Sequence, residues 1–205
     1  MRKIGSRKNA GQSLVETAIM TPILLCLVLN SINFAYFLLM AMNLTAAPHH
    51  SGLYAIQGSS APSGAALPAA GPTTTGSASA PASVSYLTYQ DLTGAINAPG
   101  SVKVQVCSAV LGTNGTGSTQ TAKCVNCTTS ASNCANGSLA GQTPDSDPEA
   151  PAFVLNRVDV TYTFSPMIPG TIFGVVLLPT SACSLSGGLM TCTIHRQVSM
   201  RAMGG

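Results

Sequence analysis

The stretch GQSLVETAIMTPILLCLVLNSINFAYFLLMAM, from Gly11 to Met42, decides the fold of this chain. It joins a short polar segment to an apolar run from Ala18 to Met42, which would form a helix of about 37 Å at 1.5 Å per residue. Because the hydrocarbon core of a bilayer is about 30 Å thick, the run predicts one transmembrane helix. A removable secretory signal has an apolar region of only about 7–15 residues, so we expect this helix to be retained.

The placement of charge predicts the topology. Four of the nine Lys and Arg residues precede residue 12, at Arg2, Lys3, Arg7 and Lys8. Cationic residues beside a membrane helix stay on the cytoplasmic side, so the amino terminus is expected inside and the chain after about residue 43 outside. The remaining cations are scattered and charged residues make up only 7% of the chain, so neither nucleic-acid binding nor a free cytosolic enzyme is expected.

Four residues between Gly11 and Met42 are unusual for a membrane helix: Glu16, Pro22, Asn30 and Asn33. An ionised carboxylate such as Glu16 beside hydrocarbon costs a few kcal/mol (~3) on insertion scales. Pro22 lacks a helical donor and favours a kink. Asn30 and Asn33 are three residues apart and share a face, which leaves two interpretations: contact with another membrane helix, or hydrogen bonds within their own helix.

The order of basic tail, Gly11, four residues, Glu16 and apolar helix resembles the processing site of type IV prepilin-like proteins. The segment GQSLVETAIMTPILL is similar to the opening of TadE-like proteins, the pseudopilins (minor pilins) of tight-adherence (Flp) pili. The resemblance implies an inner-membrane protein that a prepilin peptidase cleaves between Gly11 and Gln12, on the cytoplasmic face. Glycine suits such a cut because it lets the backbone extend into a protease cleft.

The same resemblance implies an assembly role for the retained helix. Glu16 lies about one turn from the new amino group of Gln12, so its carboxylate can neutralise that amine in a neighbouring subunit. Pro22, Asn30 and Asn33 are the other expected assembly residues. The implied partners are the prepilin peptidase, other pilin-like subunits, the Tad secretion machinery and the membrane, and the product can reach an extracellular adhesive pilus.

The rest of the chain predicts a small exterior α+β domain. We expect a leader over 1–11, a transmembrane and assembly helix over 12–57, a Ser/Ala/Pro/Gly linker over 58–83 and an exterior domain over 84–205 with a Cys-rich insert at 107–150. Within the helix, Pro48 is expected to cause a bend or an interruption.

Three strands and one short helix are expected in that domain. Near-helical spacing of apolar residues predicts the helix over 85–98, before Pro99 and Gly100. Period-two alternation predicts half-buried strands over 101–110 and 153–164, and a third strand over 189–203. In the first two, valines form the inner face, which leaves Lys103, Gln105, Cys107, Arg157 and Asp159 outward. The close of the chain, from VDVTYTFSPMIPG to HRQVSMRAM, also resembles TadE-like proteins.

Cysteine number supports an oxidising compartment. Cys26 lies in the membrane helix, and an even set follows it, comprising Cys107, Cys124, Cys127, Cys134, Cys183 and Cys192. These predict three disulfides with 15 connectivities, of which Cys183 with Cys192 is favoured because SLSGGLMT forms a tight hairpin. For the other four, a zinc site or a redox pair in CVNC are the alternatives.

No catalytic constellation emerges, so we expect neither an enzyme nor a cofactor or metal. For His195 we identify neither a nucleophile that it could activate nor an acid that could orient it. The run Asp145, Asp147 and Glu149 is interpreted as a solvated turn rather than a calcium site, and His49 with His50 as solvated residues without a nearby carboxylate. The alternative function is an uncleaved single-pass envelope protein whose disulfide-rich exterior binds a ligand or metal.

Overall fold

The computed structural model divides the chain into two compact units, each described here by itself. One comprises Met1–Leu38 and Ser165–Cys192, and the other comprises Leu39–Phe164 and Thr193–Gly205. The structure describes residues 8–57, 83–93, 101–128, 134–168, 183–186 and 189–201. Most of the expected linker, over 58–82, and the peptide over 1–7 therefore lie outside the described residues.

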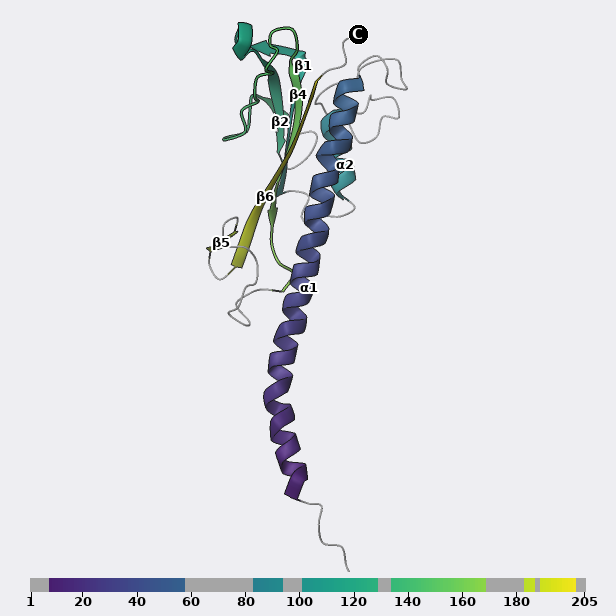
Figure 1. Cartoon of the computed structure of the whole chain (residues 1–205), viewed down its shortest axis with the longest axis vertical. Helices are drawn as coiled ribbons and strands as arrows, with labels where there is room; N and C mark the ends of the chain where they lie inside the picture. Colours follow the sequence, from purple (N-terminus) through teal and green to yellow (C-terminus); the bar gives the residue numbers. More distant parts are fainter. Residues whose placement is uncertain are drawn as a thin grey trace, which may run out of the picture. The chain divides into compact units, whose positions relative to one another are not determined.

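The amino-terminal helix, α1, is one continuous element over Lys8–Gln57 (Figure 1). It begins before Gly11 and passes through both Pro22 and Pro48, so the expected interruption at Pro48 is wrong. A proline removes only one helical hydrogen bond, at a cost of about 3 kcal/mol. Pro48 itself is buried, with Leu44 and Ala47 on the preceding turn, and this burial offsets the cost.

The strands form one six-stranded sheet in the order β3-β2-β1-β4-β6-β5. The expected α+β class with a long apolar helix, an antiparallel sheet and a short helix is therefore observed. The strand bounds are β1 Val102–Asn114, β2 Thr121–Thr128, β3 Cys134–Asn136, β4 Leu155–Phe164, β5 Cys183–Ser186 and β6 Leu189–Arg201, with a 3₁₀ turn, η3, at Gly117–Thr119.

Two strand pairs fix the register at the centre of the sheet. Antiparallel pairing places Val104 opposite Val160 and Val106 opposite Val158. On its other side β1 pairs with β2 antiparallel, and the register shifts between Ser108 and Thr113. Cross-strand valine pairs of this kind are a main source of sheet stability.

The face that carries these valines is the expected core. Val102, Val104 and Val106 are fully buried, as are Val158, Val160, Tyr162 and Phe164. The short helix α2, Val84–Thr93, buries Val84 and Leu92, and its Tyr89 hydroxyl lies 3.0 Å from the carbonyl oxygens of Val102 and Cys127. This burial raises the pKa of Tyr89.

Helix α2 starts at a capping residue that the sequence interpretation assigned to the linker. The Ser83 hydroxyl accepts a hydrogen bond from the Tyr86 amide at 3.1 Å, which satisfies a donor that would otherwise be free at the helix start. Thr88 of α2 then donates to the hydroxyl of Ser51 in α1 at 2.7 Å. The helix ends at Thr93, short of the predicted residue 98, and residues 94–100 lie outside the described part of the chain.

The opposite face of the sheet corrects the expectation of half-buried strands. Gln105, Cys107, Arg157 and Asp159 are all buried, although alternation predicted them to point outward. Only Lys103 of that set is exposed. The loop that contains Leu139 and Gln142 covers this face, because the Gln105 amide group donates to the Gln142 carbonyl oxygen at 2.7 Å and its oxygen accepts from the Leu139 amide.

Three described strands were not predicted individually. β2 and β3 lie in the Cys-rich insert that was expected to be a polar loop, and β5 forms the first arm of the predicted 183–192 hairpin. The predicted third strand is β6, in which Cys192 and Ile194 are buried and Val198 and Met200 are half-buried. Gly52 of α1 lies close to this strand, because a Cβ added there would be 3.1 Å from Val198 Cγ1.

Candidate functional site

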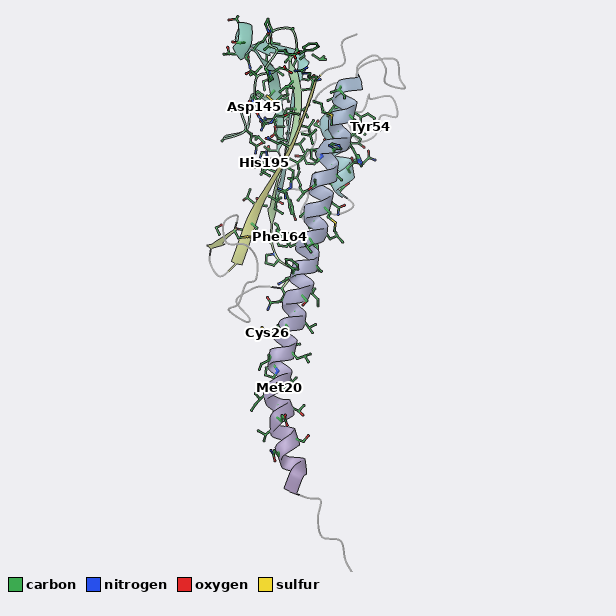
Figure 2. The ribbon with its side chains drawn as sticks, viewed as in Figure 1. Met20, Cys26, Tyr54, Asp145, Phe164 and His195 are labelled. Atoms are coloured by element: carbon green, nitrogen blue, oxygen red, sulfur yellow. A yellow bond between two sulfur atoms is a disulfide. The ribbon has the colours of Figure 1, made fainter. Side chains whose placement is uncertain are left out.

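The amino-terminal part of α1 exposes a continuous apolar surface. It is long and apolar enough to cross a membrane, and only 6% of its most apolar 18-residue stretch is buried. Figure 2 labels Met20 and Cys26 on this part, where side chains project from the helix in several directions. The exposed large apolar residues are Leu14, Val15, Ile19, Met20, Ile23, Leu24, Leu25, Leu27, Val28, Ile32, Phe34, Leu38, Leu39 and Met42.

Such a surface is unfavourable in water. Transferring one large apolar side chain out of water contributes about 1.5–3 kcal/mol, so covering this set contributes tens of kcal/mol. The first fully buried apolar side chain along the described part of α1 is Met40. The continuously exposed part of the helix therefore narrows after Leu39, although Met42 itself is still exposed.

The predicted processing residues lie at the start of this surface. Gly11, Gln12 and Glu16 are exposed, and a Cβ added at Gly11 would meet nothing within 4 Å. Among the described residues Glu16 makes no hydrogen bond or ion pair, so its carboxylate is available to an external cation. Gly11 is helical in this chain, whereas a protease cleft binds extended backbone, so cleavage would require the first turns of α1 to unwind.

Hydroxyl and amide side chains on α1 mostly bond to the helix itself. Thr17 donates to the Ser13 carbonyl oxygen at 2.8 Å, and Thr21 donates to that of Thr17 at 2.7 Å. Asn30 donates to the Cys26 carbonyl oxygen at 2.9 Å, which is the second of the two interpretations proposed for it. Back-bonding of this kind satisfies polar groups that would be costly in hydrocarbon.

Asn33 behaves differently from Asn30, although both lie on one face. Its amide group donates to the Ile168 carbonyl oxygen at 3.0 Å, and its side-chain oxygen accepts from the Ile168 amide at 3.1 Å. The partner residue is 135 positions away, just after β4. Neither interpretation anticipated this contact, since the partner is neither another helix nor the helix that carries Asn33.

The six cysteines that follow Cys26 form three disulfides, including the favoured pair Cys183–Cys192. The others are Cys107–Cys124 and Cys127–Cys134, so these four thiols are not zinc ligands and CVNC is not a redox pair. Each bond joins residues directly opposite each other on neighbouring antiparallel strands. Cys107 and Cys124 also pack with Ala122 and Val154 in a small core of their own.

A buried ion network occupies the covered face of the sheet. Arg157 Nε donates to Asp159 Oδ2 at 2.9 Å and its Nη2 donates to Oδ1 at 2.7 Å. His195 Nε2, on β6, lies 3.0 Å from the same Oδ1 (Figure 2 labels His195 and Asp145). Gln105 adds a further donor to Asp159 at 3.1 Å, and the exposed Asp145 carboxylate lies 3.3 Å from Arg157 Nη1.

This network corrects the statement that no acid orients His195. Asp159 holds the imidazole, as in a catalytic pair, but it is also engaged by the guanidinium of Arg157 and the amide of Gln105. Among the described residues no serine, threonine or cysteine side chain bonds to His195. The arrangement is therefore a buried carboxylate paired with a cation, and it activates no nucleophile in the described part of the chain.

A second ion cluster replaces the expected solvated turn. Asp147 is buried and receives both Arg201 Nε at 2.8 Å and Nη2 at 2.9 Å. Arg201 also donates to Glu149 at 3.2 Å and stacks over the Phe153 ring at 5.0 Å. The Arg201 hydrogen bond holds the pKa of the Asp147 carboxyl below its usual range.

The histidines at the end of α1 also require a correction. His50 Nδ1 lies 3.7 Å from the Asp91 carboxylate of α2, so a carboxylate does lie near this pair. Both partners are largely exposed, and an exposed ion pair of this kind contributes only about 0–1 kcal/mol. Within the described residues no group of three His, Cys, Asp or Glu side chains is placed to hold a metal ion.

One hollow lies on the β1–β2–β3 end of the sheet. Its volume is about 490 Å³ and it is lined by Leu111, Asn114, Lys123, Cys124, Val125, Asn136 and Gly137. Lys123 makes no ion pair with any described residue. The lining combines two amide side chains and one ammonium group with apolar walls, which is a composition able to hold a small polar ligand.

Comparison with protein-family models, with curated proteins and with solved structures finds no match for this chain.

Proposed function

We propose that this protein is a TadE-like minor pilin, cleaved after Gly11 by a prepilin peptidase and then packed through α1 with other pilin-like subunits of an adhesive Tad/Flp-type pilus. The observation that carries the proposal is the exposed apolar surface of α1, which begins at Leu14, three residues after Gly11, and flanks Glu16. A helix with such an exposed apolar surface must be covered by lipid before assembly and by other helices after assembly.

Two further observations support the proposal. Most polar side chains of α1 bond to their own helix, so they tolerate both a bilayer and an apolar bundle. The Glu16 carboxylate is exposed one turn after Gln12, where the amine of a neighbouring cleaved subunit would neutralise it. The three disulfides fit an exterior domain in an oxidising compartment.

The test is amino-terminal sequencing of the full chain after coexpression with a prepilin peptidase. We expect the product to begin at Gln12, and Gly11→Ala to retain Met1. Gly5→Ala is the matched control, since Gly5 lies in the same peptide away from the proposed bond, and it should still give Gln12. Wild-type protein that keeps Met1 beside an active peptidase would refute processing at this site.

A second candidate is an uncleaved single-pass envelope protein whose disulfide-rich exterior binds a ligand. The hollow lined by Asn114, Lys123 and Asn136, next to the Cys107–Cys124 bond, favours it. Retention of Met1, together with loss of ligand binding in Lys123→Ala, would support this function over the minor pilin.

A further inference from the structure

The contact between Asn33 and Ile168 joins the apolar helix to residues 165–168, the described segment that follows β4. Both residues of the contact belong to the same compact unit of the chain, which comprises Met1–Leu38 and Ser165–Cys192. The two hydrogen bonds are reciprocal: the Asn33 side chain uses its donor and its acceptor on the carbonyl oxygen and amide of a single residue. One side chain thus satisfies both backbone groups of Ile168.

The position of Asn33 on α1 sets the depth of this contact. A hydrocarbon core of about 30 Å takes about 20 helical residues. Burial on α1 begins at Met40, so we place the outer end of the span between Asn33 and Leu38, which puts the contact at, or within about 8 Å inside, the outer edge of the hydrocarbon. Ile168 would then lie at the same level as the helix residue that binds it.

Backbone outside a helix or barrel is costly at that depth. Each unsatisfied amide or carbonyl group costs several kcal/mol (~2–7) in an apolar medium, so non-helical backbone there needs protein partners. Asn33 supplies those partners for Ile168. The neighbouring side chain, Met167, is 59% exposed and apolar, and Phe34 on the adjacent helix position is also exposed.

We infer that the described residues after β4, 165–168, make a second membrane contact, with Met167 in the outer lipid interface and Asn33 holding Ile168 there. The exposed Met167 side chain would contact lipid acyl chains. The inference rests on the membrane placement of α1 in the proposed function, and it adds that the exterior domain is held to the bilayer at a second point besides the helix.

A tryptophan scan tests this, because the chain contains no Trp. Full-length protein carrying Met167→Trp would be reconstituted in phosphatidylcholine vesicles whose acyl chains are brominated at a shallow position. Two references have similarly exposed sites: Leu24→Trp on α1, 64% exposed, and Val110→Trp on β1, 71% exposed. We expect emission of the Met167→Trp protein to be lost to nearly the extent of Leu24→Trp, and Val110→Trp to be unaffected.

Matched amide variants then test the role of Asn33. In the Met167→Trp protein, Asn33→Leu should reduce quenching toward the Val110→Trp level. Asn30→Leu should leave quenching unchanged, because Asn30 bonds to Cys26 on its own helix. Circular dichroism and intact disulfides would confirm that both variants fold.

The outcomes separate this inference from the proposed function. If Leu24→Trp is quenched and Met167→Trp is not, the second contact is wrong while the membrane helix stands. If Asn33→Leu and Asn30→Leu quench equally, Asn33 does not hold the segment. If Leu24→Trp itself escapes quenching, α1 is not in the bilayer, and both the second contact and the proposed function are overturned.

Discussion

Asp147 shows how one buried carboxylate depends on one arginine. Because Arg201 lowers the pKa of Asp147 from its ordinary 3.8, folding is stabilised by the ionised form. That stabilisation is present above the ordinary pKa and is lost as pH falls through the lower folded value. We therefore expect stability of the wild-type protein to fall on acidification below about pH 4 by more than that of Asp147→Asn.

The measurement is the urea midpoint of the full-length protein in detergent between neutral pH and about pH 2. Glu149→Gln is the control, since Glu149 meets the same arginine but its side chain is 59% exposed. It should retain the acid dependence of wild type. Identical acid profiles for wild type and Asp147→Asn would contradict the role assigned to this carboxylate.

Arg157 has two carboxylate partners that differ in burial. Asp159 is fully buried, whereas the side chain of Asp145 is 75% exposed. Removing one partner of a buried pair leaves an uncompensated charge and costs about 3–5 kcal/mol, while an exposed pair contributes about 0–1 kcal/mol. We expect Asp159→Asn to lower the free energy of unfolding far more than Asp145→Asn, measured by chemical denaturation; equal losses would contradict the buried network.

At the scale of elements, the disulfides lie in pairs of neighbouring strands and differ in their surroundings. Cys107–Cys124 closes a separation of 17 residues and packs in its own small core, while Cys127–Cys134 closes only 7. Loop-closure entropy alone gives about 2–3 kcal/mol for each. Loss of buried packing should therefore make Cys107→Ala/Cys124→Ala the more destabilising double variant.

Denaturation under non-reducing conditions would compare the two double variants in otherwise identical protein. The remaining disulfides serve as internal controls, since thiol titration must show two of three bonds intact in each variant. A larger loss from Cys127→Ala/Cys134→Ala would mean that the Cys107–Cys124 core contributes little.

What the sequence predicts among the elements follows from local pattern. The apolar run after Ala18 and the valine alternation of β1 and β4 are local signals, and both correspond to described elements. Alternation cannot tell that a loop covers the second face, so Gln105 and Asp159 were assigned to the outside. β2 and β3 lie in the Cys-rich insert and lack the valine alternation of β1 and β4, and the pairing of Cys127 with Cys134 becomes visible only in the structure.

Contacts between distant residues were out of reach for the same reason. The pairing of His195 with Asp159 requires β6 to lie beside β4. Without knowledge of that strand order, the sequence does not identify a partner for the histidine. The Asn33–Ile168 contact joins residues 135 positions apart. In the candidate site, the exposure of Gly11 and Glu16 was compatible with the sequence pattern, whereas the difference between Asn30 and Asn33 was not visible in it.

At the scale of the whole molecule, the three disulfides limit how far the chain extends under tension. They enclose separate stretches of 17, 7 and 9 residues, so their effects on contour length add. At about 3.5 Å per residue they withhold roughly 100 Å of extension. Pulling single molecules by their ends with and without a reductant should show a difference of about that size, and equal contour lengths would contradict the three bonds. A subunit anchored at one end and loaded at the other would thus keep its stapled hairpins short while the rest of the chain lengthens.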